Sequence, residues 1–176
     1  QGLGGPPRGA LAQPAGAPLL TVWGGKITTF RKLAEDAAHL LCQQLHHTSA
    51  PWTHSAHLPG GDFRAHITPT GQPSTDFARF VETLGSRLPQ ASPALRQRLA
   101  RAYGTRITLL GDALGAEIAP GLHEAELHYL HRHEWARSAN DVLWRRSKLG
   151  LHLNEAERAQ VARWCDAHWG KALPAN

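Results

Sequence analysis

The chain has 176 residues, a formal net charge of +5 and 41% hydrophobic residues. This length allows a domain with a real core, and six tryptophans argue against wholesale disorder. No stretch approaches the ~18 consecutive apolar residues of a membrane span. Cys42 and Cys165 form no CxxC pair, which favours reduced thiols in a cytosolic setting. Because the chain begins at Gln1 and contains no methionine, we expect it to be a piece of a longer protein.

The positive charge comes mainly from arginine, and lysine occurs only at positions 26, 32, 148 and 171. No basic stripe is interleaved with aromatic residues, so we predict no nucleic-acid partner. The positive charge is about as compatible with anionic lipid or an anionic substrate as with nucleic acid.

The first 45 residues predict a linker followed by one strand and one helix. Residues 1–18 are almost entirely Gly, Pro, Ala and Gln, a composition typical of a linker or a trimmed loop. Residues 19–23 predict a buried strand that ends at Gly24 and Gly25. A helix follows, with Thr28 or Thr29 as its cap. The strand has no predicted partner in the chain, so we expect its neighbours to lie upstream.

The rest of the sequence predicts a connecting segment and then helices only. Residues 46–73 are rich in proline, glycine and histidine without periodicity, whereas 74–176 show helical spacing throughout. Ser92 before Pro93 and the pair Asn154 and Glu157 predict helix starts. The fold class is therefore mainly α: an all-helical bundle of five or six short helices, preceded by a strand–turn–helix.

The turn between the strand and the first helix is the strongest candidate site. Helix N-termini present free N–H groups and partial positive charge. Gly24 and Gly25 allow a ligand to approach the backbone there, and Lys26 adds a full charge. The turn therefore suits a phosphate, a carboxylate or a reduced flavin. The alternative is an ordinary strand–helix turn with Lys26 in solvent.

Three further features have structural alternatives. The histidines at 123, 128, 131 and 133 lack the HExxH pattern, so we predict no metal site. The basic segment 137–148 fits either an anionic surface or internal ion pairs, such as Arg145 with Asp141. Cys165 lies on the buried stripe of the last helix and is expected in the core rather than in catalysis.

Several segments together resemble one known family. The run LLTVWGGKITTFRKLAE at 19–35 resembles the end of the flavin domain of FAD-dependent sn-glycerol-3-phosphate dehydrogenases. Five further segments resemble parts of that family's C-terminal helical domain. They are LPGGD at 58–62, YGTR at 103–106, EAEL at 124–127, HEWAR at 133–137 and DVLWRRSKL at 141–149. These matches follow one another in the same order along nearly the whole chain after residue 18.

The resemblance implies an activity, a cofactor and roles for the turn residues. Such enzymes oxidise sn-glycerol 3-phosphate to dihydroxyacetone phosphate with FAD, pass the electrons to membrane quinone, and lie peripherally on the cytoplasmic face of the cell membrane. By resemblance, Gly24, Gly25, Ile27 and Thr28 would contact FAD, and Lys26 would act on the substrate. The strand–turn–helix would then be a remnant of the FAD domain, with 74–176 as the helical domain. The N-terminal FAD domain of the same polypeptide is the implied partner, and a homodimer is possible.

Two alternatives stay open beside this interpretation. The helical domain, on its own, is expected to be inactive and free of FAD, and it would then serve as an interaction or regulatory module. The related glycerophosphate oxidases give electrons to oxygen instead of quinone, and the sequence does not separate these acceptors.

Overall fold

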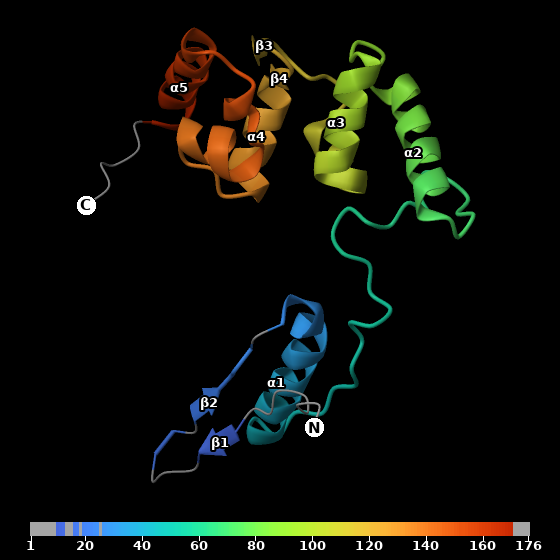
Figure 1. Ribbon diagram of the computed structural model, residues 1–176, viewed down its shortest axis with the longest axis vertical. Helices are drawn as coiled ribbons and strands as arrows, with labels where there is room; N and C mark the ends of the chain where they lie inside the picture. Colours follow the sequence, from blue (N-terminus) through green and yellow to red (C-terminus); the bar gives the residue numbers. More distant parts are fainter. Residues whose placement is uncertain (1–9, 13–15, 18, 25, 171–176) are drawn as a thin grey trace, which may run out of the picture. The chain divides into compact units, whose positions relative to one another are not determined.

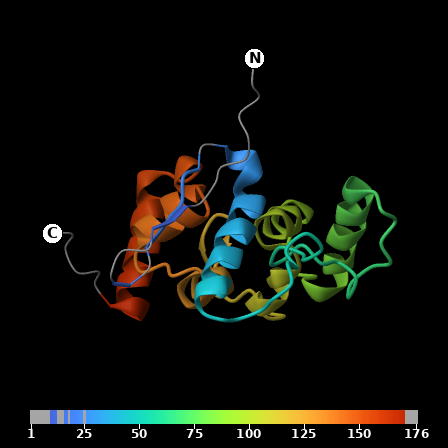
Figure 2. The same cartoon turned by 90° about the horizontal axis from the view of Figure 1, so that it is seen from below.

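The computed structural model describes residues 10–12, 16–17, 19–24 and 26–170. It divides into two compact units, Gln1–Ala56 and His57–Asn176, and each is described by itself (Figures 1 and 2). No helix in the described part of the chain is both long and apolar enough to cross a bilayer.

The first unit is a small hairpin followed by a helix. Strand β1 (Ala10–Ala12) pairs antiparallel with β2 (Leu19–Thr21), with Leu11 opposite Leu20. A 3₁₀ turn (Ile27–Thr29) then leads into α1 (Phe30–Gln44). Helix α1 forms where the apolar periodicity of the sequence predicts a helix, but none of its residues is buried.

Two expectations about the strand are wrong. The strand has a partner within the chain, because Ala10–Ala12, in a stretch expected to be a linker, forms strand β1 and pairs with it. The expected strand is also not buried: β2 ends at Thr21, and Trp23 beyond it is 73% exposed. An isolated two-stranded hairpin is only marginally stable in water.

The second unit holds the core. Its α-helices are α2 (Pro73–Arg87), α3 (Pro93–Tyr103), α4 (Glu124–His133) and α5 (Glu155–Trp169). They follow one another across the unit in the order α2, α3, α4, α5 (Figure 1). The fully buried side chains come from all four and from the turns between them, and they include Phe80, Leu84, Leu99, Ile107, Leu127, Leu130, Val142 and Val161. The mainly α fold class is confirmed.

The predicted helix starts of the second unit are confirmed, whereas the expected cap of α1 is not, because no Thr28 or Thr29 side chain caps that helix and Thr29 Oγ1 donates to Lys26 O instead. Ser92 Oγ accepts a hydrogen bond from Leu95 N at 3.1 Å, with Pro93 in the first turn of α3. Asn154 and Glu157 form a reciprocal capping box at the start of α5. Gly104 ends α3 at a φ of +53°. These three sites define the ends of α3 and the start of α5.

The second unit departs from the expected all-helical bundle at one hairpin and in the type of three short helices. Strands β3 (Glu117–Ala119) and β4 (Leu122–His123) pair antiparallel around Pro120 and Gly121. Strands of three and two residues are too short to show alternation in a sequence. Gly104–Leu110 and Leu149–Leu151 are 3₁₀ helices, and Asp141–Arg146 is π-helical.

Candidate functional site

The turn that precedes α1 exposes every described residue of the predicted ligand site. Lys26 is extended, with a φ of −123°, and Ile27 is 87% exposed. Gly24 and Thr28 are exposed as well, whereas Gly25 lies outside the described residues. A Cβ at Gly24 would lie 3.1 Å from Leu33 Cδ2, so the glycine lets the turn pack closely against α1.

The helix start behind this turn has no side-chain cap. Neither the 3₁₀ turn nor α1 receives a capping hydrogen bond from a side chain. The Lys26 carbonyl instead accepts hydrogen bonds from Thr29 N at 3.2 Å and Thr29 Oγ1 at 3.1 Å. Lys26 has no ion-pair partner among the described residues. Free N–H groups beside an unpaired ammonium suit an anionic ligand, so the donor set fits an electron-rich cofactor edge.

The next turn of α1 is held in place by a structural ion pair. Arg31 Nη1 lies 2.7 Å from Glu35 Oε1, and both contact Thr53 Oγ1 in the following segment. The Thr53 hydroxyl, which donates to the carboxylate, lowers the pKa of Glu35, and the charge of Arg31 adds to this. Arg31 therefore ties residues near 53 to the helix and is not available to a ligand at the turn.

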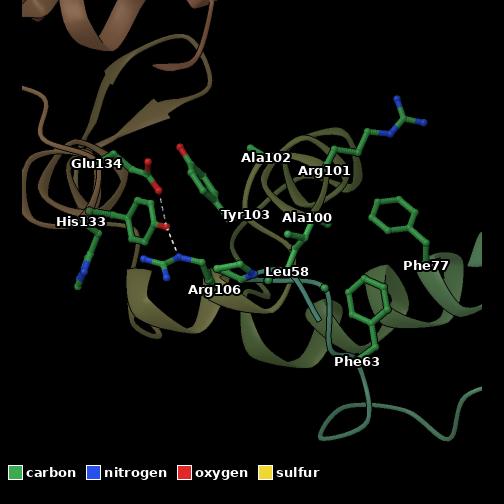
Figure 3. A pocket seen from close by; sticks show the side chains of 15 residues that line it. Leu58, Phe63, Phe77, Ala100, Arg101, Ala102, Tyr103, Arg106, His133 and Glu134 are labelled. Carbon is green, nitrogen blue, oxygen red and sulfur yellow. Dashed lines mark hydrogen bonds between the residues drawn. The ribbon is translucent and has the colours of Figure 1, made fainter. Parts of the chain in front are cut away.

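The second unit contains a surface pocket of about 580 Å³, shown in Figure 3. Leu58, Phe63 and Phe77 form its apolar wall, while Arg106, His133 and Glu134 contribute polar groups. Its floor depends on two glycines. A Cβ at Gly104 would lie 2.0 Å from Gly60 O, and one at Gly60 would lie 2.5 Å from Tyr103 O. The LPGGD and YGTR segments thus need glycine where their backbones meet.

One hydrogen-bonded chain crosses the polar side of this pocket (Figure 3). Arg106 Nε donates to Tyr129 Oη at 2.7 Å, and Tyr129 Oη donates to Glu134 Oε1 at 3.1 Å. Burial raises the pKa of Tyr129, so its hydroxyl stays protonated at neutral pH. The chain presents a guanidinium and a carboxylate side by side, which suits a small polar ligand or a polar protein surface. In the sequence, Arg106 belongs to the YGTR segment, for which the family resemblance implies a place in the helical domain but no role.

A buried ion pair supports this side of the unit. Glu126 is 1% exposed and accepts both Nη groups of Arg98 at 2.8 and 2.6 Å. Tyr103 Oη also donates to Glu126 at 2.6 Å, and burial raises the pKa of this tyrosine. The carboxylate is fully surrounded by donors, so the cluster is structural and joins α3 to α4.

The histidine-rich stretch forms an aromatic cluster. His131 stacks on Trp169 at 4.6 Å, and His168 stacks on Trp164 at 4.0 Å. His131 Nδ1 also lies 2.7 Å from Ala136 O. Within the described ranges no three His, Cys, Asp or Glu residues are placed to hold a metal ion. The cluster joins α4 to α5 by packing.

Two arginines of the basic segment make internal contacts of the kind that the structural alternative predicts. Arg145 Nη1 lies 3.0 Å from Asp141 Oδ1, one helical turn away. Arg146 Nε donates to Glu134 O at 2.6 Å. Trp144 packs so closely that a Cβ at Gly150 would lie 2.7 Å from its ring.

The two cysteines differ in environment. Cys165 is buried, as expected for a core residue, and burial raises the pKa of its thiol to about 12. Cys42 is half-buried on α1. Neither of them pairs with the other in a disulfide.

A comparison with protein families matches residues 51–168 to the C-terminal domain of alpha-glycerophosphate oxidase. This match covers most of the chain and includes the pocket, the buried ion pair and the aromatic cluster except Trp169.

Individual curated proteins are similar over an even longer stretch. D-erythritol 1-phosphate dehydrogenase of Brucella abortus is 41% identical over 162 residues, 89% of this chain and 30% of that protein. Aerobic glycerol-3-phosphate dehydrogenase of Escherichia coli is 39% identical over 154 residues, 84% of this chain and 29% of that protein. Glycerol-3-phosphate dehydrogenase of Pseudomonas aeruginosa is 39% identical over 153 residues, again 84% of this chain. The chain thus spans about 30% of the length of these relatives.

Proposed function

This chain belongs to the family of the C-terminal domain of alpha-glycerophosphate oxidase and corresponds to the C-terminal portion of aerobic glycerol-3-phosphate dehydrogenases; from this premise we propose that it forms part of a flavoprotein that oxidises a polyol phosphate. The substrate is sn-glycerol 3-phosphate, the product is dihydroxyacetone phosphate, and FAD is the first electron acceptor. The observation that supports this most directly is the uncapped helix start beside Lys26, within the segment that resembles the end of the flavin domain.

The turn residues would act on the substrate and on the cofactor. FAD, when bound, supplies the acceptor for the hydride that leaves C2 of the substrate. The N–H groups of Gly24, Gly25, Ile27 and Thr28 would place partial positive charge against the edge of the cofactor that gains electrons. The Lys26 ammonium would orient the C2 hydroxyl and stabilise the negative charge that develops on its oxygen.

The exposed apolar surface of the first unit supports an N-terminal FAD domain as its partner. Trp23, Ile27 and Phe30 are 73, 87 and 65% exposed, and α1 buries no residue. An amphipathic helix with an uncovered apolar face requires a packing partner. In the whole enzyme, the flavin-binding part would cover this face, and the 176-residue chain alone would bind no FAD and have no activity.

Substrate and acceptor are tested together on the full-length enzyme. We expect dihydroxyacetone phosphate from sn-glycerol 3-phosphate, with quinone reduced and little peroxide formed. A higher kcat/KM for D-erythritol 1-phosphate than for sn-glycerol 3-phosphate would instead indicate the activity for which the Brucella relative is named. Stoichiometric peroxide would favour the oxidase alternative. The enzyme is proposed to lie on the inner face of the cell membrane, where quinone is accessible.

The flavin colour of the purified full-length enzyme distinguishes the proposed flavoprotein from a non-catalytic protein module. Full-length enzyme should purify with a flavin absorption band, and the 176-residue chain should be colourless. Flavin bound by the 176-residue chain would contradict the assignment of the cofactor site to contacts from both parts.

A further inference from the structure

Trp135 adopts a backbone conformation that bulky residues rarely adopt. Its φ is +56°, and its side chain is 77% exposed. Left-handed residues after a helix are usually Gly or Asn, because a Cβ is strained there. An exposed indole also leaves a large apolar area in water, so Trp is an unfavourable choice here for the isolated domain on two counts.

The turn that carries Trp135 is fixed from several sides. Ala136 N donates to Leu130 O at 3.0 Å, and Ala136 itself is fully buried. His131 Nδ1 lies 2.7 Å from Ala136 O, and Arg146 Nε donates to Glu134 O at 2.6 Å. Both neighbouring residues are therefore held by hydrogen bonds, while the Trp135 indole between them stays exposed. Strain that the surroundings impose in this way is typical of binding sites.

The charges around Trp135 are mainly positive. Arg132 and Arg137 are exposed and lie within three residues of it, and Arg146 contacts its turn. The nearby Glu134 carboxylate already accepts the Tyr129 hydroxyl, and Asp141 pairs with Arg145. A partner surface that complements this patch is therefore acidic around an apolar pocket.

The geometry favours a protein partner over a bilayer or a second copy. A single rigid indole between a half-buried glutamate and a buried alanine fits a shaped pocket, whereas stable membrane attachment needs more than one insertion signal. A two-fold contact between copies would bring the same arginines face to face. The chain spans about 30% of its relatives' length, which leaves a large polypeptide in those relatives to supply the pocket.

We propose that Trp135 is an interdomain anchor, which inserts into an acidic-rimmed apolar pocket on the flavin-binding part of the same polypeptide. This inference rests on the proposed function only in that a flavin-binding part exists. Binding in that pocket compensates for the strained backbone and removes the indole from water.

Amide hydrogen exchange measures the contact directly. Peptides that contain residues 134–137 should exchange at least about 10-fold more slowly in the full-length enzyme than in the 176-residue chain. Trp135→Gly, which relieves the strain and removes the indole, should abolish this difference. It should leave the Tm of the 176-residue chain equal or higher, and lower that of the full-length enzyme.

Lys148 offers a matched control in the same unit. It is exposed and also left-handed, with a φ of +60°. Lys148→Gly relieves comparable strain without removing an aromatic side chain, so it should stabilise both proteins and leave the exchange of 134–137 unchanged. Equal effects of Trp135→Gly and Lys148→Gly in the full-length enzyme would overturn the proposal.

Two further outcomes would overturn it in favour of other partners. Protection of 134–137 that depends on protein concentration would assign Trp135 to a second copy. Protection that appears only with vesicles of anionic phospholipid would assign it to a membrane surface. Because exchange and Tm need no turnover, a wrong substrate assignment would leave these results unaffected, and an unprotected turn would leave the substrate assignment unaffected.

Discussion

Replacing Gly104 by alanine should disrupt the junction between the LPGGD and YGTR segments. The residue combines a φ of +53° with a ψ of −136°, a region that favours glycine strongly. A Cβ there would lie 2.0 Å from Gly60 O and 2.8 Å from Gly60 C, so backbone atoms must move. That movement would break the 2.9 Å hydrogen bond from Thr105 N to Gly60 O.

The expected cost follows from these two effects. The backbone conformation costs alanine about 1–3 kcal/mol, and the loss of the half-buried hydrogen bond adds about 1 kcal/mol. The sum, about 3 kcal/mol, corresponds to a fall in Tm of roughly 10 °C for a chain of this size. Thermal unfolding monitored by tryptophan fluorescence measures it, because Trp135, Trp144, Trp164 and Trp169 all lie in the second unit.

Gly111 provides the control for this experiment. It has a φ of +82°, but a Cβ added there would meet no neighbouring atom within 4 Å. Gly111→Ala therefore tests backbone strain alone, and about 1–3 kcal/mol is expected, without the further cost of a lost hydrogen bond. Equal destabilisation by the two variants would refute the close approach of Gly60 and Gly104.

Three further predictions concern buried ionisable groups. Glu126→Ala leaves the Arg98 guanidinium without its carboxylate and should destabilise the chain by about 3 kcal/mol in urea unfolding, whereas Asp36→Ala in an exposed pair should cost under about 0.5 kcal/mol. Hydrogen bonds from the Thr70 N–H and hydroxyl lower the pKa of Asp76 in the folded chain. The ionised carboxylate therefore stabilises the fold above the unfolded pKa of about 3.9, and this stabilisation is lost as the pH falls through the lowered pKa. Asp76→Asn should flatten the pH dependence of the free energy of unfolding in this range. Ellman's reagent at pH 8 should modify Cys42 and spare Cys165, and fast labelling of two thiols would contradict the burial of Cys165.

Local signals in the sequence were enough to predict the helices. Ser92 with Pro93, and Asn154 with Glu157, each act through contacts within one turn, so their partners are adjacent in sequence. The β3–β4 hairpin was missed because its strands are too short for a periodic pattern. The partner of β2 was missed because β1 lies in a stretch whose composition resembles a linker.

The pocket required information that no local pattern contains. Arg106 and Tyr129 are 23 residues apart and meet only because the 3₁₀ helix Gly104–Leu110 packs against α4. The resemblance had marked the segments that carry Arg106 and Glu134, but not their joint contact with one hydroxyl. Trp135 likewise belongs to one of those segments, and only its backbone angle distinguishes it from an ordinary surface tryptophan.

The most direct test of the proposed function is the turnover of full-length enzyme with Lys26→Ala. If the Lys26 ammonium stabilises the oxygen of the reacting alcohol, kcat should fall by about 10² or more, the scale of losing one such donor. Lys32→Ala is the matched control, because Lys32 is exposed on α1 and pairs with Asp36 at 2.8 Å; its turnover should stay near that of the unmodified enzyme. Near-normal turnover of Lys26→Ala with sn-glycerol 3-phosphate would contradict the account.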